Sequence, residues 1–118
     1  MTAAAQAAPH MVIANTLLAQ LGGRRFIAMT GAKDLLALSA DQEQSMMGGL
    51  QFNLPRGLAK DGINRVRITL NCADTYKVEA LKVSVRSLSC NVIGSTDNVY
   101  WDQLENVFSD LTGLATRI

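Results

Sequence analysis

The residues that most resemble a site of chemistry lie at 30–34, where Thr-Gly-Ala-Lys-Asp follows a short apolar run. A phosphate-binding loop needs an earlier glycine and then Gly-Lys followed by Ser or Thr, so that backbone amides and the lysine surround the phosphates. Here only Gly31 precedes Lys33, and Asp34 stands where a hydroxyl would bind magnesium. The motif is therefore absent, and we expect a turn with an exposed lysine.

Residues suited to acid–base or nucleophilic catalysis are sparse. His10 is the sole histidine, and no carboxylate is placed to orient it. Cys72 and Cys90 form no CxxC pair and are expected to be small buried or strand residues and not nucleophiles, with Cys90 on the apolar face of its strand. Asp61 and Asp74 could form a carboxylate pair, but aspartates in turns usually bind the local backbone. We therefore expect no enzyme, catalytic residue, metal site or cofactor, with an uncharacterised hydrolase as the alternative.

The charges of the chain are unevenly distributed, although the formal net charge is only +1. Residues 24–86 contain ten basic and six acidic residues, whereas residues 95–118 contain four acidic residues and one arginine. A basic sheet face can follow the phosphates of a nucleic acid. Platforms for base stacking are scarce, because aromatic residues make up only 5% of the chain. The opposite charges also permit a homodimer in which the acidic segment meets a basic face.

Contact residues are therefore sought among the cations and at the single tryptophan. Trp101 stands beside the apolar stripe of the predicted C-terminal helix, so it is either an exposed anchor for a partner or packs over the sheet edge. Lys82 and Arg86 are further cations near the predicted strands. The candidate residues for binding a partner protein or a nucleic acid are Arg24, Arg25, Lys33, Arg56, Lys60, Arg65, Arg67, Lys77 and Trp101.

The elements that must position these residues follow from the apolar periodicity. Residues 9–21 have helical spacing and end at a glycine pair, which predicts an N-terminal helix. A buried strand is predicted at 24–29, and residues 34–39 form either a second strand or a short helical turn. The polar stretch 40–49, with two methionines, is predicted to be a loop and a candidate contact site.

The second half of the chain alternates between apolar and polar residues, which is typical of half-exposed strands. Strands are predicted at 50–55 and 64–71, and one long or two shorter strands over 74–94. Residues 95–98 offer caps for a C-terminal helix whose buried stripe begins at Tyr100. Gly113 is placed to end that helix.

These elements predict an α+β fold with an N-terminal helix, an antiparallel meander of four or five strands, and a C-terminal helix packed on the sheet. A length of 118 residues with 48% hydrophobic content suits one domain over 9–118, after a flexible lead at 1–8. The chain shows neither a secretory signal nor the roughly 18 apolar residues of a membrane span. Two isolated cysteines indicate a reducing cytoplasm, so no membrane partner is expected.

Three stretches together resemble a small protein family of bacteriophages and prophages. They are IANTLLAQLGGRRFIAMTGAK at 13–33, ITLNCADTYKVE at 68–79 and NVYWDQLENVFSDLTGL at 98–114. The resemblance implies a mobile-element origin, the cytoplasm of a bacterial host cell and an accessory or host-interaction role. We therefore expect a small non-enzymatic protein that modulates or inhibits a host protein complex, such as a defence complex. The alternative is an auxiliary nucleic-acid-binding protein that uses a basic sheet face.

Overall fold

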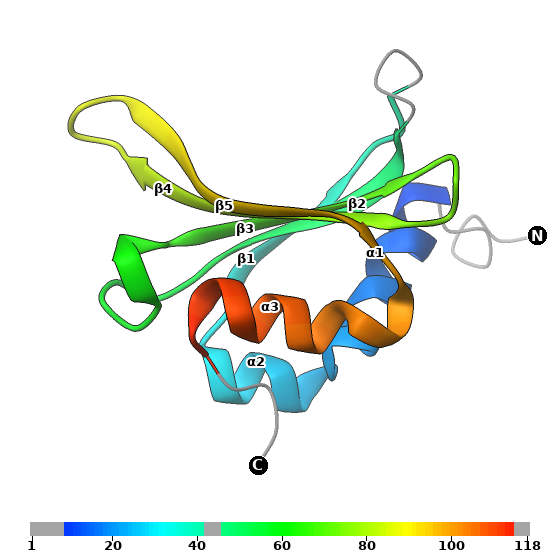
Figure 1. Cartoon of the computed structure of the whole chain (residues 1–118), viewed down its shortest axis with the longest axis horizontal. Helices are drawn as coiled ribbons and strands as arrows, with labels where there is room; N and C mark the ends of the chain where they lie inside the picture. The colour runs from blue at the N-terminus through cyan, green and yellow to red at the C-terminus, as the bar shows by residue number, and fades with distance from the viewer. Residues whose placement is uncertain (1–8, 42–45, 115–118) are drawn as a thin grey trace, which may run out of the picture.

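The computed structural model describes residues 9–41 and 46–114, in which one face of a five-stranded antiparallel sheet is covered by three α-helices (Figure 1). The strand order β1-β2-β3-β4-β5 makes each strand the neighbour of the next one in the chain. The predicted α+β fold and its meander are therefore confirmed, while the predicted lead at 1–8 lies outside the described residues. The elements are α1 (Pro9–Leu21), α2 (Arg24–Thr30), β1 (Lys33–Leu38), β2 (Met46–Asn53), η2 (Lys60–Gly62), β3 (Arg65–Asn71), β4 (Tyr76–Ser84), β5 (Ser89–Val99), η3 (Trp101–Gln103) and α3 (Leu104–Thr112).

The predicted loop at 40–49 is wrong in its second part, because Met46 already begins strand β2. Gly48 allows helix α1 to lie close to this strand, and Gly49 allows the close approach of the neighbouring strand β3. A Cβ at Gly48 would lie 2.9 Å from Ile13 Cδ1 of α1, and a Cβ at Gly49 would collide with the carbonyl oxygen of Ile68 on β3. The glycine pair therefore belongs to a strand under a helix, although its composition is typical of a loop.

Residues 24–29, predicted as a buried strand, form helix α2 instead. Gly31 ends the helix with a φ of 73°, and its amide donates a hydrogen bond to the carbonyl of Ile27. The buried Thr30 hydroxyl donates to the carbonyl of Phe26 over 2.7 Å. An apolar run this short fits a strand or a helix equally well by periodicity. The packing of Phe26 decides between them.

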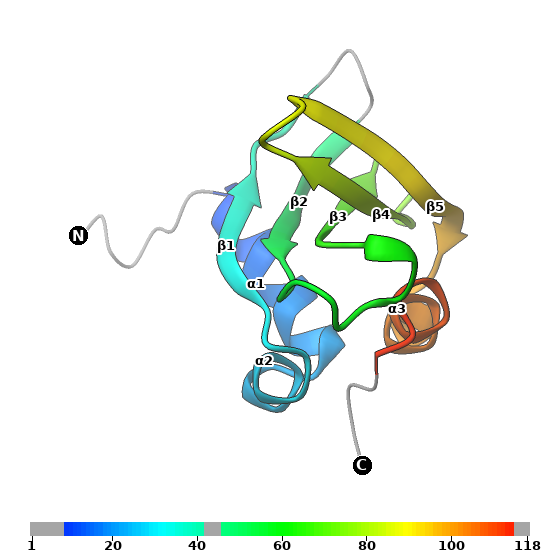
Figure 2. The ribbon, with the colours of Figure 1, turned by 90° about the vertical axis from the view of Figure 1, so that its left-hand side faces the viewer.

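Three phenylalanine rings join α2, β2 and α3 in the core between the sheet and the helices. The centroid of the Phe26 ring lies 5.2 Å from those of Phe52 and Phe108, in edge-to-face geometry. On β3, Val66 and Ile68 are fully buried under the same layer. The intervening residues of β3 point to the opposite face, which no helix of the described residues covers (Figures 1 and 2).

Strand β5 is longer than predicted, so the C-terminal helix begins later. Residues 95–98, predicted as helix caps, lie in β5, which ends at Val99. A 3₁₀ turn, η3, then leads into α3, which ends as predicted at Gly113 with a φ of 77°. Tyr100 was predicted on the buried stripe, but 57% of it is exposed, because η3 and not α3 contains the residues that follow it.

Candidate partner-binding site

The nine predicted contact residues separate into groups in the folded chain. The group on the uncovered sheet face is Arg65, Arg67 and Lys77. The group around a hollow at the end where β4 and β5 project is Lys33, Arg56 and Arg65. The group at the helix layer is Arg24, Arg25 and Trp101. Lys60 is separate from these groups, since its stem lies near Gly113 at the end of α3.

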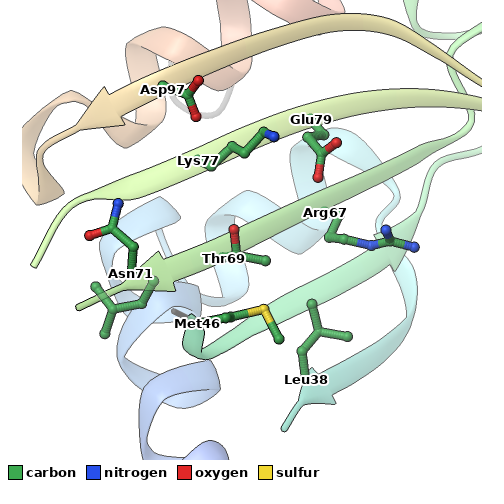
Figure 3. Close-up of a pocket in the computed structure, with 9 residues that line it drawn as sticks. Leu38, Met46, Arg67, Thr69, Asn71, Lys77, Glu79 and Asp97 are labelled. Atoms are coloured by element: carbon green, nitrogen blue, oxygen red, sulfur yellow. The ribbon is translucent and has the colours of Figure 1, made fainter. Parts of the chain in front are cut away.

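The uncovered sheet face carries a hollow of about 500 Å³ with charges of both signs (Figure 3). Arg67 and Lys77 line it together with Glu79 and Asp97. The Arg67 Nε donates a hydrogen bond to Gln51 Oε1 of the adjacent strand over 3.1 Å. None of the described residues that line this hollow is aromatic. The face can therefore contact phosphates or carboxylates through its cations, but it offers no platform for base stacking.

Trp101 lies at a different place, on η3 between the end of β5 and the start of α3. Its relative exposure is 64%, so of the two predicted positions the exposed one is found. Gln103 holds this turn, because its Oε1 accepts a hydrogen bond of 3.0 Å from the backbone amide of Tyr100. The indole is therefore exposed on a hydrogen-bonded turn, and tryptophan is enriched among the residues that contribute most to protein interfaces.

Two adjoining hollows share Trp101 as a wall, and we call them together the Trp101 hollow. Their volumes are about 540 and about 250 Å³, and both are also lined by Thr16 and Gln20 of α1. The aliphatic lining comes from Val12 and Ile13 of the same helix. The carboxylate residues that line the two hollows are Asp74, Asp102 and Glu105. The site is thus an apolar and aromatic hollow with an acidic border.

Tyr76 lines the inner part of the Trp101 hollow. Burial raises the pKa of its hydroxyl above the ordinary value of about 10, and the nearby Asp74 acts in the same direction, while a hydrogen bond with Gln20 opposes them. The Oε1 atom of Gln20 is buried without a hydrogen-bond partner among the described residues. The hollow is therefore lined by a phenol that stays protonated at neutral pH, and the unpaired Gln20 oxygen lies buried behind its surface.

Arg25 connects the helix layer to the Trp101 hollow. Its guanidinium lies 3.7 Å from the Glu105 carboxylate, which also lines the hollow. Arg24, the preceding residue, is exposed on the first turn of α2. The structure therefore brings Arg25 and Trp101, which are 76 positions apart in the sequence, to one site.

The residues considered for catalysis lie apart from one another. Cys72 and Cys90 are both exposed, so the expectation that Cys90 is buried on an apolar strand face is wrong. Cys90 pairs with Val83 where β4 and β5 continue beyond β3, and Cys72 lies in the turn that follows β3. Asp61 and Asp74 have positive φ values of 56° and 65° in turns. Among residues 9–41 and 46–114, no group of three or more His, Cys, Asp or Glu side chains could hold a metal ion.

Sequence reasoning missed several residues of the Trp101 hollow. Val12 follows the helical spacing of α1 and is exposed at the hollow. Gln20 and Asp74 are polar residues with no motif around them. Val12 and Gln20 come from α1 and Asp74 from the turn between β3 and β4, so only tertiary packing brings them to Trp101 and no local pattern could have predicted the site.

No family model, curated protein or solved structure matches this chain. Within the described part of the chain, no helix is both long and apolar enough to cross a membrane.

Proposed function

We propose that this chain is a small non-enzymatic binding protein that contacts a host protein complex through the Trp101 hollow and modulates or inhibits that complex. The observation that carries the proposal is a 64% exposed tryptophan on a hydrogen-bonded turn, at the border of an apolar hollow. Tryptophan truncations are among the most costly at protein interfaces, since an indole buries a large area when it docks. The acidic border favours a partner with an apolar projection surrounded by basic residues.

The resemblance to bacteriophage and prophage proteins supports the host cell as the source of the partner. A mobile-element protein without a catalytic constellation acts by occupying a surface, and defence complexes are one class of target. On this proposal the protein works in the bacterial cytoplasm. It adds no chemistry of its own to the complex that it binds.

The experiment is capture of partner complexes from host lysate with the full chain, compared with Trp101→Ala, Arg24→Ala and Arg25→Ala. We expect Trp101→Ala to lower the affinity for the captured complex by roughly 30-fold or more, the effect of a loss of about 2 kcal/mol. Leu58→Ala is the matched control, because Leu58 has a relative exposure of 58% and does not line the hollow. Equal capture by Trp101→Ala and the unmodified chain would contradict the proposal.

A second candidate function is auxiliary nucleic-acid binding on the uncovered sheet face. It is favoured by one observation, that Arg65, Arg67 and Lys77 emerge from neighbouring strands on that face. Reversal of Arg65 and Arg67 to Glu should then abolish binding to nucleic acid in a salt titration. Binding that survives the reversal would exclude this face.

The charge distribution also supports a homodimer as part of the proposal. Carboxylates surround the Trp101 hollow, whereas cations surround the opposite end of the sheet. Two copies could place these ends against each other. Light scattering of the purified chain tests this proposal, and a monomer at all concentrations would exclude it.

A further inference from the structure

Strands β4 and β5 continue beyond the rest of the sheet as a two-stranded ribbon. The last pair between β3 and β4 is Arg65 with Leu81, whereas β4 and β5 continue to pair up to Ser84 with Ser89. We call residues 82–91, with the turn at 85–88, the hairpin arm. Figure 1 shows it in yellow-green and yellow at the left, at the opposite end of the sheet from the start of α3.

Beyond the end of β3, the side chain of Asn64 forms the hydrogen bonds with β4 that a third strand would form. Asn64 Nδ2 donates to the carbonyl of Val83 over 2.8 Å, and Asn64 Oδ1 accepts from the amide of Val83 over 2.8 Å. The backbone amide of Asn64 also donates to the carbonyl of Leu81 over 3.0 Å. The ribbon therefore projects in a defined direction and not as a free loop.

The surroundings of the arm are basic. Two hollows of about 610 and about 230 Å³ adjoin the stem and share Arg56, Asn64, Val83 and Val85. No carboxylate residue lines either hollow among the described residues, and residues 80–96 contain no Asp or Glu. The nearby Asp34 carboxylate accepts a hydrogen bond from Asn53. The cations that line the hollows are Lys33, Arg56, Arg65, Lys82 and Arg86.

The tip of the arm combines two features that are unfavourable in an isolated protein. Leu88 has a φ of 53°, a conformation in which Asn or Gly is usual, and its relative exposure is 89%. Val85 is 83% exposed beside it. A strained and exposed apolar residue at a projecting tip is typical of a contact that is made only with a partner. Of the other arm side chains, Ser84, Ser87, Ser89 and Asn91 are small and polar, and Cys90 is a small exposed thiol.

The dimensions of the arm fit one class of polyanion. Three residue pairs extend beyond Leu81, at Lys82, Val83 and Ser84 of β4. At about 3.3 Å per residue these pairs and the turn project by roughly 10 Å. The major groove of B-form DNA is about 12 Å wide and about 8.5 Å deep and admits a two-stranded β-ribbon. Single strands are less suitable, since no aromatic residue occurs within residues 77–99 to stack on bases.

We propose that the hairpin arm enters the major groove of double-stranded DNA, with the five cations around its stem on the flanking phosphates. Ser and Asn side chains of the ribbon then face the base edges, and Leu88 contacts an apolar group such as a thymine methyl. This site is distinct from the Trp101 hollow and does not depend on the proposed partner binding. It shares Arg65 with the uncovered sheet face, so the variants that test it are made at Lys82 and Arg86, which do not line the hollow of that face. Together the hairpin arm and the Trp101 hollow would make the chain a link between duplex DNA and a protein.

The test is equilibrium binding of the full chain to a labelled DNA duplex across a salt series. The other probes are duplex RNA of the same sequence, single-stranded DNA and polyglutamate. We expect the DNA duplex to bind roughly tenfold or more tightly than each of them, because the A-form major groove is too narrow to admit the ribbon. Equal binding of duplex RNA or polyglutamate, or no binding of duplex DNA at low salt, overturns the proposal.

Two variants locate the contact on the protein. Lys82→Ala combined with Arg86→Ala should lower the slope of log affinity against log salt by about 2, since each cation releases about one counterion. Lys60→Ala is the matched control, because Lys60 lines neither hollow, and its slope should equal that of the unmodified chain. An unchanged slope in the double variant excludes the arm.

Leu88→Asn tests the tip separately from the cations. We expect roughly fivefold weaker binding of duplex DNA with an unchanged salt slope, because the tip contacts bases and not phosphates. Asn tolerates the positive φ, so the unfolding midpoint should not fall and misfolding cannot explain the weaker binding. An unchanged affinity would overturn insertion of the arm. Trp101→Ala should leave DNA binding unaffected, which separates this proposal from the partner-binding one.

Discussion

The two ends of the sheet differ in nearly every surface property although the same strand, β5, reaches both of them. At the end of the hairpin arm, five cations line two hollows to which the described residues contribute no carboxylate residue. At the other end, Trp101 and aliphatic residues of α1 form a hollow bordered by carboxylates. The helices cover one face of the sheet, and the arm projects beyond them, whereas the Trp101 hollow is lined by α1 (Figure 1).

The difference shows how a domain of this size can carry two surfaces of opposite chemistry at once. The net charge of +1 conceals them, because the basic and acidic groups are separated in space. Desolvating an indole and neutralising phosphates are different contributions to affinity, the first insensitive to salt and the second strongly dependent on it. Substitutions can therefore change one end and leave the other intact, or remove both through the core that they share.

The largest effect is expected from the shared core. Phe26→Ala removes the ring that contacts both Phe52 and Phe108, so it should lower the free energy of unfolding by about 3–5 kcal/mol. Urea denaturation followed by circular dichroism measures this. Leu58→Ala, at an exposed position, should change the free energy by no more than about 0.5 kcal/mol. A loss below about 1 kcal/mol for Phe26→Ala would contradict the helical placement of residues 24–30 in the core.

An intermediate effect is expected at the arm end alone. Asn64→Ala leaves the amide and carbonyl of Val83 without their partners, which costs about 1–3 kcal/mol. Hydrogen exchange should show faster exchange at the Val83 amide and unchanged protection in α1. The matched control is Asn106→Ala, an exposed position on α3. Equal protection of Val83 in the variant and the unmodified chain would show that the arm does not depend on Asn64.

The smallest effect is expected at the Trp101 end, at high pH. Burial raises the pKa of Tyr76 in the folded chain, so the folded state binds the phenolic proton more tightly than the unfolded state does. The resulting contribution to stability is fully present below the ordinary pKa of about 10 and is lost as the pH rises through the folded value. The free energy of unfolding of the unmodified chain should therefore fall in that alkaline window.

In Tyr76→Phe the free energy of unfolding should decrease less at alkaline pH, because Phe has no proton to lose. At neutral pH the variant should lose about 1 kcal/mol or less, the value of its hydrogen bond with Gln20. Unfolding curves over a pH series measure both effects. Tyr100→Phe, at an exposed tyrosine, is the matched control and should keep the fall of the unmodified chain. A fall of equal depth in Tyr76→Phe would show that another group causes it.

The sheet was predictable wherever one face of a strand is buried and the other is not. On β3, Val66 and Ile68 alternate with Arg65 and Arg67, and that alternation is enough to assign both the strand and its two faces. Residues 24–29 were not predictable, because the buried position of Phe26 depends on rings from β2 and α3. Residues 95–98 have the composition of helix caps, but their pairing with β4 keeps them in a strand.

The candidate sites divide in the same way. The cations and Trp101 were identified from residue type alone, since charge and indole chemistry do not depend on the fold. The way these residues group in space was not predicted. Arg25 is placed at the Trp101 hollow by its ion pair with Glu105, which lines that hollow. The basic surroundings of the arm could be recognised only from the strand register, which shows that β4 and β5 continue beyond the end of β3.

The sequence alone determined the α+β class, the meander, the end of α3 and the separation of basic from acidic segments, because each follows from local periodicity, turn chemistry or charge. Only the tertiary structure decided that residues 24–30 are helical, that Trp101 is exposed at a hollow, and that residues 82–91 project. The physical reason is that these three features depend on contacts between segments far apart in the chain, whose packing and hydrogen bonds override local preference.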